Sequence, residues 1–198
     1  MLSLAARALP ALLFLPLVWL FFLSYLEYLE TGAGFGVNPD EAFVKYLGEW
    51  SIRILLVAYS ISPVSRVFGW RALAKMRRFV GLTAFMYVLL HLTSYVLLYI
   101  ELDWGVLLED VIERKYVVVG FLAFFCLLLM TITSTNGWKK RLGSNWRALH
   151  RLIHIVVLFS LLHYIWLTKD GFGVIFFYVV CFGVLSIERV VRFTRKTG

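Results

Sequence analysis

Charged residues are scarce in this sequence, and their scarcity excludes an ordinary water-soluble domain. Only 16% of the residues are charged and 61% are hydrophobic, whereas soluble domains carry roughly 25% charged and 45–50% apolar residues. Several apolar runs approach or exceed the roughly 18–20 residues that cross a bilayer. The composition therefore predicts an integral membrane protein that contacts membrane lipid.

Other absences narrow the class of protein further. The net charge is +8, but the sequence has no zinc-finger spacing and no basic coiled coil, so we expect no nucleic-acid partner. The glycines of the stretch 31–36 follow no strand, which indicates a flexible loop rather than a phosphate-binding turn. Cys126 and Cys181 lie within apolar runs, where thiols usually pack. The loops are also too short for a soluble catalytic domain.

Six apolar runs predict an all-α, polytopic membrane bundle that forms one domain over residues 1–198. The expected spans cover residues 8–26, 50–67, 79–100, 116–133, 148–167 and 172–187. Each must be helical, because a backbone in lipid has to satisfy its own hydrogen bonds. The first run is long for a cleaved signal peptide and no small-x-small cleavage site follows it, so we expect a retained span.

The distribution of charge supports six spans. With a cytoplasmic N-terminus, fifteen of the 20 basic residues fall on the inner side, and eleven of the 12 acidic residues, all but Glu188, fall on the outer side. Positive charge is enriched in cytoplasmic loops. We therefore expect both termini to be cytoplasmic.

All four histidines, His91, His150, His154 and His163, fall in the third and fifth expected spans. Ionisable residues within a membrane are functional candidates by default. Both spans run outward, and at 1.5 Å per residue the heights of His91 and His163 agree to within roughly 8 Å. Two imidazoles that face each other from adjacent helices can ligate a heme iron from both sides. We therefore expect His91 and His163 to hold heme.

His150 is a candidate for a second heme site, about 20 Å closer to the cytoplasm along the same helix. The corresponding position on the third span is Arg78, which is a poor iron ligand but can pair with heme propionates. His150 and His163 share one helix face only if the helix is locally irregular, because thirteen residues turn an ideal helix roughly 140° out of alignment. His154 lies one turn after His150 on nearly the same face. Packing or a hydrogen bond is its default role, and the alternatives are that it replaces His150 as a ligand or donates to a heme propionate as a neighbour of the heme.

Two alternative chemistries fit the sequence less well. Zinc needs three or four clustered ligands, and only His150 and His154 share a face. Ion-coupled transporters usually carry buried Asp or Glu, which the span centres lack. The stretch 131–136 is interpreted as a helix end with a capping turn, although beside Arg141, Trp146 and Arg147 it can also line a pocket for an anionic group such as a flavin phosphate.

The chain resembles the MsrQ (YedZ) family, the heme-binding membrane subunits of the bacterial periplasmic methionine sulfoxide reductase system, within the ferric-reductase-like transmembrane group. The resemblance covers nearly the whole chain and rests on order and spacing rather than on one decisive motif. The matching residues are Asn38-Pro39, Gly48-Glu49-Trp50, Pro63, Arg77-Arg78, Gly81, His91, Thr133-Ser134-Thr135, Arg141-Leu142-Gly143, Trp146, Leu149-His150-Arg151-Leu152, His163-Tyr164 and Trp166.

The resemblance implies heme b, with His91, His150 and His163 as ligands of the heme iron, and with one heme or two. It also implies bound FMN, electrons from the quinone pool or a flavin reductase, and a periplasmic molybdopterin partner, MsrP, in a bacterial inner membrane. His154 departs from the family, which often has an aromatic residue there. Two other functions remain open: another transmembrane ferric or cytochrome b-type reductase, and a non-redox transporter whose histidines only join helices.

Overall fold

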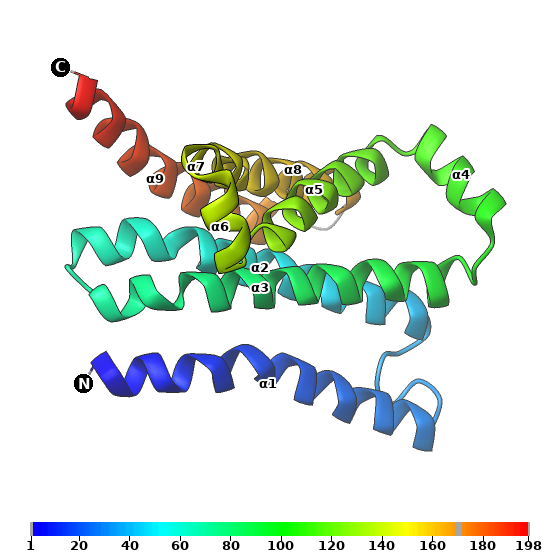
Figure 1. Ribbon diagram of the computed structural model, residues 1–198. Coiled ribbons are helices and arrows are strands. Elements are labelled where there is room, and N and C mark those ends of the chain that lie inside the picture. The colour runs from blue at the N-terminus through cyan, green and yellow to red at the C-terminus, as the bar shows by residue number, and fades with distance from the viewer. Residues whose placement is uncertain (1, 169–171, 198) are drawn as a thin grey trace.

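A computed structural model describes residues 2–168 and 172–197, and this part of the chain consists of helices and connecting loops, without strands (Figure 1). The long helices are α1 (Leu2–Leu29), α2 (Pro39–Val67), α3 (Arg71–Ser94), α5 (Lys115–Ile132), α8 (Ile153–Leu167) and α9 (Phe172–Thr197). Shorter elements are the π-helical segment Tyr95–Tyr99, α4 (Trp104–Glu113), α6 (Asn136–Leu142), α7 (Ser144–Leu149) and the 3₁₀ turn His150–Leu152. The predicted all-α class is confirmed.

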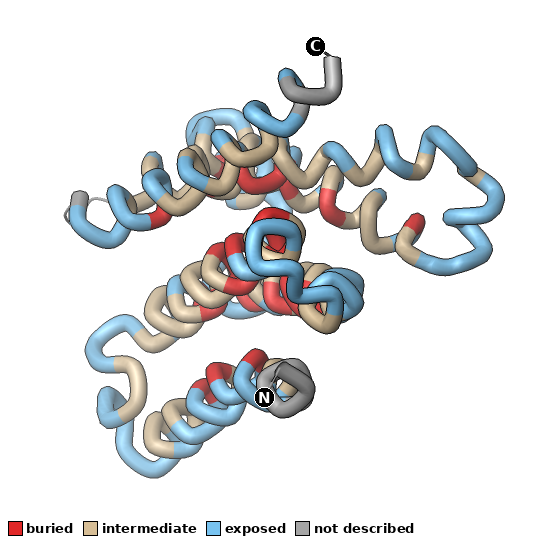
Figure 2. Tube along the Cα trace, turned by 90° about the vertical axis from the view of Figure 1, so that its left-hand side faces the viewer, coloured by how far each residue is buried: buried red, intermediate tan, exposed pale blue. Residues whose placement is uncertain are grey.

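Two helical hairpins form the centre of the bundle. α2 packs along α3, and α5 packs along α8, while α1 lies beside the first hairpin. Burial is concentrated in α2 and α3, and α1 buries only one side (Figure 2). Two hydroxyls attach α1 to this hairpin, because Tyr46 donates to the carbonyl of Pro16 at 2.9 Å and Tyr87 to that of Leu13 at 2.8 Å.

Local sequence explains where several helices begin. Pro39 opens α2, where a missing N–H costs nothing. Asp103 caps α4 by accepting hydrogen bonds from the backbone N–H groups of Gly105 and Val106. Thr135 caps α6 in the same way through the N–H of Trp138. The predicted capping turn at residues 131–136 is therefore present.

Five helical stretches of the described chain are long and apolar enough to cross a membrane: Ala8–Leu29, Arg71–Tyr99, Lys115–Ile132, Ser144–Leu167 and Gly173–Arg192. α2, which contains the expected span 50–67, is not among them. The sixth crossing and the cytoplasmic termini therefore stay predictions. Both ends of the chain nevertheless lie at the same end of the bundle (Figure 1).

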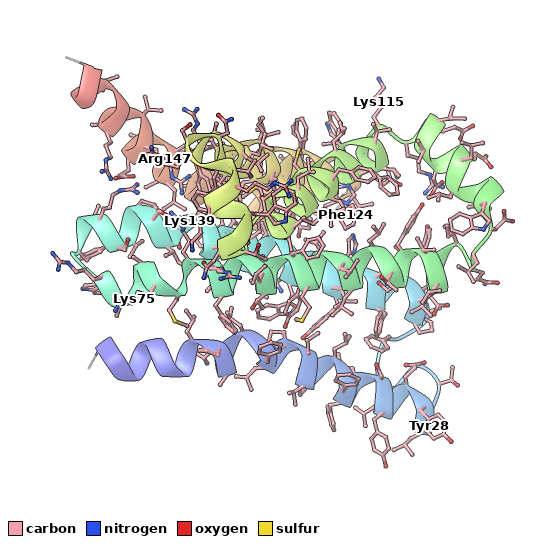
Figure 3. The ribbon with its side chains drawn as sticks, viewed as in Figure 1. Tyr28, Lys75, Lys115, Phe124, Lys139 and Arg147 are labelled. Carbon is pink, nitrogen blue, oxygen red and sulfur yellow. The ribbon has the colours of Figure 1, made fainter. Side chains whose placement is uncertain are left out.

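Basic side chains gather at the end of the bundle that holds the two termini. Lys75, Lys139 and Arg147 lie toward this end, whereas Tyr28 and Lys115 lie toward the other (Figure 3). Lys169, which the six expected spans would place on the outer side, is outside the described residues. Lys75, Lys139 and Arg147, which the expected topology assigns to one side, thus lie toward one end of the bundle, as expected where positive charge orients a membrane protein.

Candidate functional site

His91 on α3 and His163 on α8 face each other between the two hairpins. Their ring centroids are 6.3 Å apart and the ring planes are inclined by 77°. A metal–imidazole bond is about 2 Å long and a ring nitrogen lies about 1 Å from its centroid, so two imidazoles on opposite sides of one metal ion have centroids about 6 Å apart. The observed spacing fits one metal ion held between the two rings.

A backbone carbonyl sets the proton position in each ring. Nδ1 of His91 lies 3.0 Å from the carbonyl oxygen of Val44, and Nδ1 of His163 lies 2.7 Å from that of Tyr116. A carbonyl only accepts hydrogen bonds, so Nδ1 carries the proton in both rings. Nε2 therefore keeps its lone pair, and no hydrogen bond within the described residues engages it. This is the tautomer and orientation of a histidine that binds metal.

His150 has the same tautomer at a second place. It begins the 3₁₀ turn between α7 and α8, and its Nδ1 donates to the carbonyl of Trp146 at 3.1 Å. Its ring stacks on the Trp146 indole at a centroid distance of 3.9 Å. Its Nε2 is buried and has no hydrogen-bond partner among the described residues. Buried acceptors usually have a hydrogen-bond partner. A group bound in the neighbouring space would explain why Nε2 of His150 has none.

His154 differs, because both of its ring nitrogens have protein partners. Nδ1 lies 2.9 Å from the hydroxyl of Tyr59, and Nε2 lies 3.4 Å from a guanidinium nitrogen of Arg189. The Tyr59 hydroxyl also contacts the Ser186 hydroxyl at 3.0 Å. His154 thus belongs to a polar cluster that joins α2, α8 and α9. Its default role from the sequence, a hydrogen bond, is what the structure has.

His150 and Arg78 line one cavity, here called the basic cavity, with a volume of about 610 Å³. Ligand pockets typically measure roughly 300–1,000 Å³. Among the described residues its lining contains no Asp or Glu, and it contains eight cationic side chains: Arg66, Lys75, Arg77, Arg78, Lys139, Arg147, Arg151 and Arg189. Such a lining favours a ligand with carboxylates or phosphates.

The sequence located only part of this cavity. The sequence suggested a pocket for an anionic group formed by the stretch 131–136 with Arg141, Trp146 and Arg147. The cavity is lined by five of these residues, Thr131, Ser134, Asn136, Trp146 and Arg147, but not by Arg141. Tyr59, Arg66 and Arg189 were missed, because α2 and α9 meet α8 only in the folded chain. Lys75 and Arg77, in the first two turns of α3, were read from the sequence only as a topology signal, because one sequence does not distinguish a ligand-binding cation from an orienting one.

A second polar cluster lies next to His163 at the opposite end of α5. The buried carboxylate of Asp110 accepts a hydrogen bond from the Tyr95 hydroxyl at 2.6 Å and pairs with Nε of Arg114 at 2.9 Å. Arg114 also donates to the Tyr116 hydroxyl at 3.1 Å, and this bond raises the pKa of Arg114. The cluster fixes α4 against the start of α5, where the Tyr116 carbonyl holds His163.

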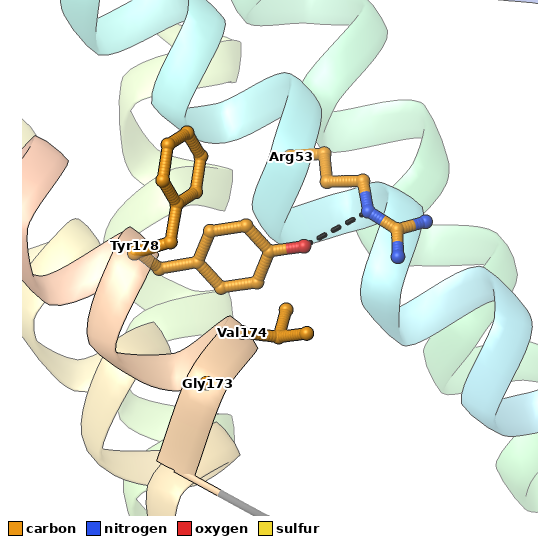
Figure 4. A pocket seen from close by; sticks show the side chains of 5 residues that line it. Arg53, Gly173, Val174 and Tyr178 are labelled. Atoms are coloured by element: carbon orange, nitrogen blue, oxygen red, sulfur yellow. Dashed lines mark hydrogen bonds between the residues drawn. The ribbon is translucent and has the colours of Figure 1, made fainter.

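A further depression, of about 410 Å³, lies between α2 and α9 and is distinct from the histidines. Nε of Arg53 donates to the Tyr178 hydroxyl at 2.9 Å beside Gly173 and Val174 (Figure 4). Apart from Arg53 and this hydroxyl its lining is apolar. The contact joins α9 to α2 and carries no candidate ligand group.

The fold and the histidine pair define a class, a helical membrane protein with paired imidazoles between two hairpins. Residues 47–161 match the family described as ferric reductase like transmembrane component. This segment contains α3, α5 and three of the four histidines, and it ends two residues before His163.

Several curated proteins align over most of the chain. A Caulobacter vibrioides protein is 38% identical over 89% of this chain and 82% of its own length, and a Rhodospirillum rubrum protein is 37% identical over 92% and 85%. A Xanthomonas campestris protein is 38% identical over 68% and 62%. Each is named protein-methionine-sulfoxide reductase heme-binding subunit MsrQ. The chain belongs to the MsrQ family, as its residues indicated.

Proposed function

We propose that this protein holds heme b between His91 and His163 and serves as the membrane electron-transfer subunit of a protein-methionine-sulfoxide reductase system. The observation that carries the proposal is the facing pair of imidazoles, both with Nδ1 protonated and both with Nε2 free. The names of the relatives, which describe heme-binding subunits, agree with it.

The residues of the chain bind and orient, and the heme supplies a one-electron carrier when it is bound. His91 and His163 would hold the heme iron through one imidazole nitrogen each, and a heme held from both sides would favour electron transfer over oxygen activation. The carbonyls of Val44 and Tyr116 hold the proton of each ring at Nδ1, so that the lone pair of Nε2 would be the one available to iron. Leu161 on α8 and Tyr87 on α3, which precede the two histidines on their helices, are themselves buried.

We further propose that the basic cavity holds a second redox group, either a second heme b or FMN. The free, buried Nε2 of His150 supports heme, with His150 as the iron ligand and Arg78 beside the propionates. The eight cations support either group, since both carry anionic substituents. His154, which has two protein partners, acts as a neighbour and not as a ligand.

The direction of electron flow follows from the proposed orientation in a bacterial inner membrane. With six crossings and cytoplasmic termini, the basic cavity lies on the cytoplasmic side and the pair His91–His163 lies nearer the periplasm. A quinol or a flavin reductase would then supply electrons from the inner side. The periplasmic molybdopterin enzyme MsrP would receive them for the repair of oxidised methionine in proteins.

The ligand assignment is tested by heme content and spectra of purified variants. We expect the unmodified protein to be red, with a reducible low-spin spectrum, and His91→Ala or His163→Ala to abolish that signal. His154→Ala is the control, since its heme content should match that of the parent protein. A full complement of low-spin heme in both His91→Ala and His163→Ala would refute the assignment.

A second candidate function is the reduction of ferric chelates, because the matching family is named for ferric reductases. The two functions share heme chemistry and differ in the acceptor. Reduced protein in vesicles, offered a ferric chelate or a molybdopterin sulfoxide reductase, separates them. Oxidation of the heme by the enzyme and not by the chelate supports the first function.

A further inference from the structure

The two facing histidines are held by the same arrangement on two different hairpins. The carbonyl that accepts from His91 lies 47 residues before it, and the carbonyl that accepts from His163 also lies 47 residues before its histidine. A glycine follows each carbonyl residue by four positions, Gly48 after Val44 and Gly120 after Tyr116. α2 with α3, and α5 with α8, therefore present their imidazoles through matching positions.

Each glycine lies directly against the imidazole on the neighbouring helix. A methyl carbon on Gly48 would lie 2.9 Å from Cε1 and 3.2 Å from Nδ1 of His91. A methyl carbon on Gly120 would lie 2.8 Å from Nδ1 and 3.1 Å from Cε1 of His163. Carbon atoms that are not bonded to each other prefer roughly 3.5–4.0 Å, so neither position accepts a side chain unless the ring moves.

The ring cannot move without losing its hydrogen bond. Residues four apart lie one above the other on the same helix face, so the carbonyl and the glycine contact the same ring. The carbonyl holds Nδ1, while the glycine allows the ring to come close enough for that bond of 3.0 Å in His91 and 2.7 Å in His163. Together these contacts fix the tautomer, the depth and the direction of Nε2.

We propose that Val44 with Gly48, and Tyr116 with Gly120, form two matched imidazole seats that position Nε2 of His91 and His163 for axial ligation, and that Gly48 and Gly120 are positioning residues of the heme site. The role of Nε2 as a ligand rests on the proposed function, whereas the contacts of the seats belong to the protein alone. Removal of such supporting contacts typically costs about 10- to 100-fold in metal affinity or activity.

The first test compares Gly48→Ala and Gly120→Ala with Gly183→Ala. Gly183 on α9 is the matched control, because a methyl group there meets nothing within 4 Å. We expect each seat variant to lose most of its heme per chain, or to keep heme with a changed low-spin electron paramagnetic resonance signal and a shifted midpoint potential. Gly183→Ala should leave all three quantities unchanged.

The second test is a double-mutant cycle that applies even where a seat variant binds no heme. Gly48→Ala should lower the thermal unfolding temperature in detergent in the parent protein and in His163→Ala, but not in His91→Ala, where no ring remains to collide with the methyl group. Gly120→Ala should lower the thermal unfolding temperature in the parent protein and in His91→Ala, but not in His163→Ala.

The outcomes separate the two proposals. If His91→Ala and His163→Ala keep full low-spin heme, the proposed function fails, and the cycle still reports on the contacts. If His91→Ala and His163→Ala lose heme, but Gly48→Ala and Gly120→Ala keep the heme content, electron paramagnetic resonance signal and midpoint potential of the parent protein, the seats are refuted. The proposed function then stands. A cost of Gly48→Ala that persists in His91→Ala also refutes the seats.

Discussion

At the scale of single residues, the hydrogen bonds of the ring nitrogens separate two neighbouring histidines. His150 and His154 lie one helical turn apart, yet only His150 leaves a buried nitrogen free. His154 is bound through both nitrogens, to Tyr59 and to Arg189. One histidine is therefore available to a ligand in the basic cavity, and the other holds three helices together.

This difference predicts opposite phenotypes. His154→Ala should keep the parent heme content but lower the free energy of unfolding by about 1–2 kcal/mol, the cost of a lost buried hydrogen bond. His150→Ala should remove the second redox group while the spectrum due to His91 and His163 persists. Quantifying heme and flavin per chain, with thermal unfolding in detergent, checks both; equal losses of cofactor in the two variants would contradict the distinction.

The sequence was sufficient to pair His91 with His163, because depth in a helical span depends only on the rise per residue. Their juxtaposition at 6.3 Å is in the structure, and the role as heme ligands stays a prediction. Gly48 and Gly120 could not be recognised in advance. Their requirement arises between helices that are distant in the chain, and the one available signal was an equal separation of 43 residues from each histidine.

At the scale of elements, α4 depends on one buried carboxylate. Asp110 is 4% exposed and pairs with both Tyr95 and Arg114. We expect Asp110→Asn to weaken both contacts and to release α4, at a cost of about 1–3 kcal/mol in local stability. Faster proteolysis and hydrogen exchange of residues 101–114 would report this release.

Glu109→Gln is the control for Asp110→Asn, because it removes a neighbouring but exposed charge. It should leave the exchange rates of α4 unchanged. The start of α5, including Tyr116, should exchange faster only in Asp110→Asn, because that carboxylate binds Arg114. Identical exchange in the two variants would show that Asp110 does not anchor the helix.

Element boundaries were predictable where apolar runs end sharply, and less so where helices are irregular. The expected span 116–133 corresponds closely to α5, Lys115–Ile132. The expected span 148–167 is interrupted by the 3₁₀ turn His150–Leu152. In an ideal helix His150 and His163 would point in different directions, and a local irregularity of this kind changes the angle between them. The π-helical end of α3, Tyr95–Tyr99, has no signal in the apolar pattern.

At the scale of the whole molecule, α2 is central to the bundle although it is poor in apolar residues. Of the long helices, only α3 is less apolar on average. α2 buries eleven residues, more than any other helix described, and charges such as Lys45, Glu49 and Arg53 lie in its first half. Other helices shelter its buried residues from lipid, so apolarity alone does not reveal whether it crosses the membrane. The common end of the two termini in Figure 1 favours a crossing.

The crossing of α2 predicts that its two flanks label from opposite sides. Val37, before α2, is 96% exposed, and Phe68, after it, is 61% exposed. In a variant without Cys126 and Cys181, we expect Val37→Cys to react with an impermeant thiol reagent from the periplasm and Phe68→Cys only from the cytoplasm. Cysteines added at the two termini should react from the cytoplasm alone. Same-side labelling of Val37→Cys and Phe68→Cys would make α2 a helix that does not cross, leave five crossings, and place the termini on opposite sides.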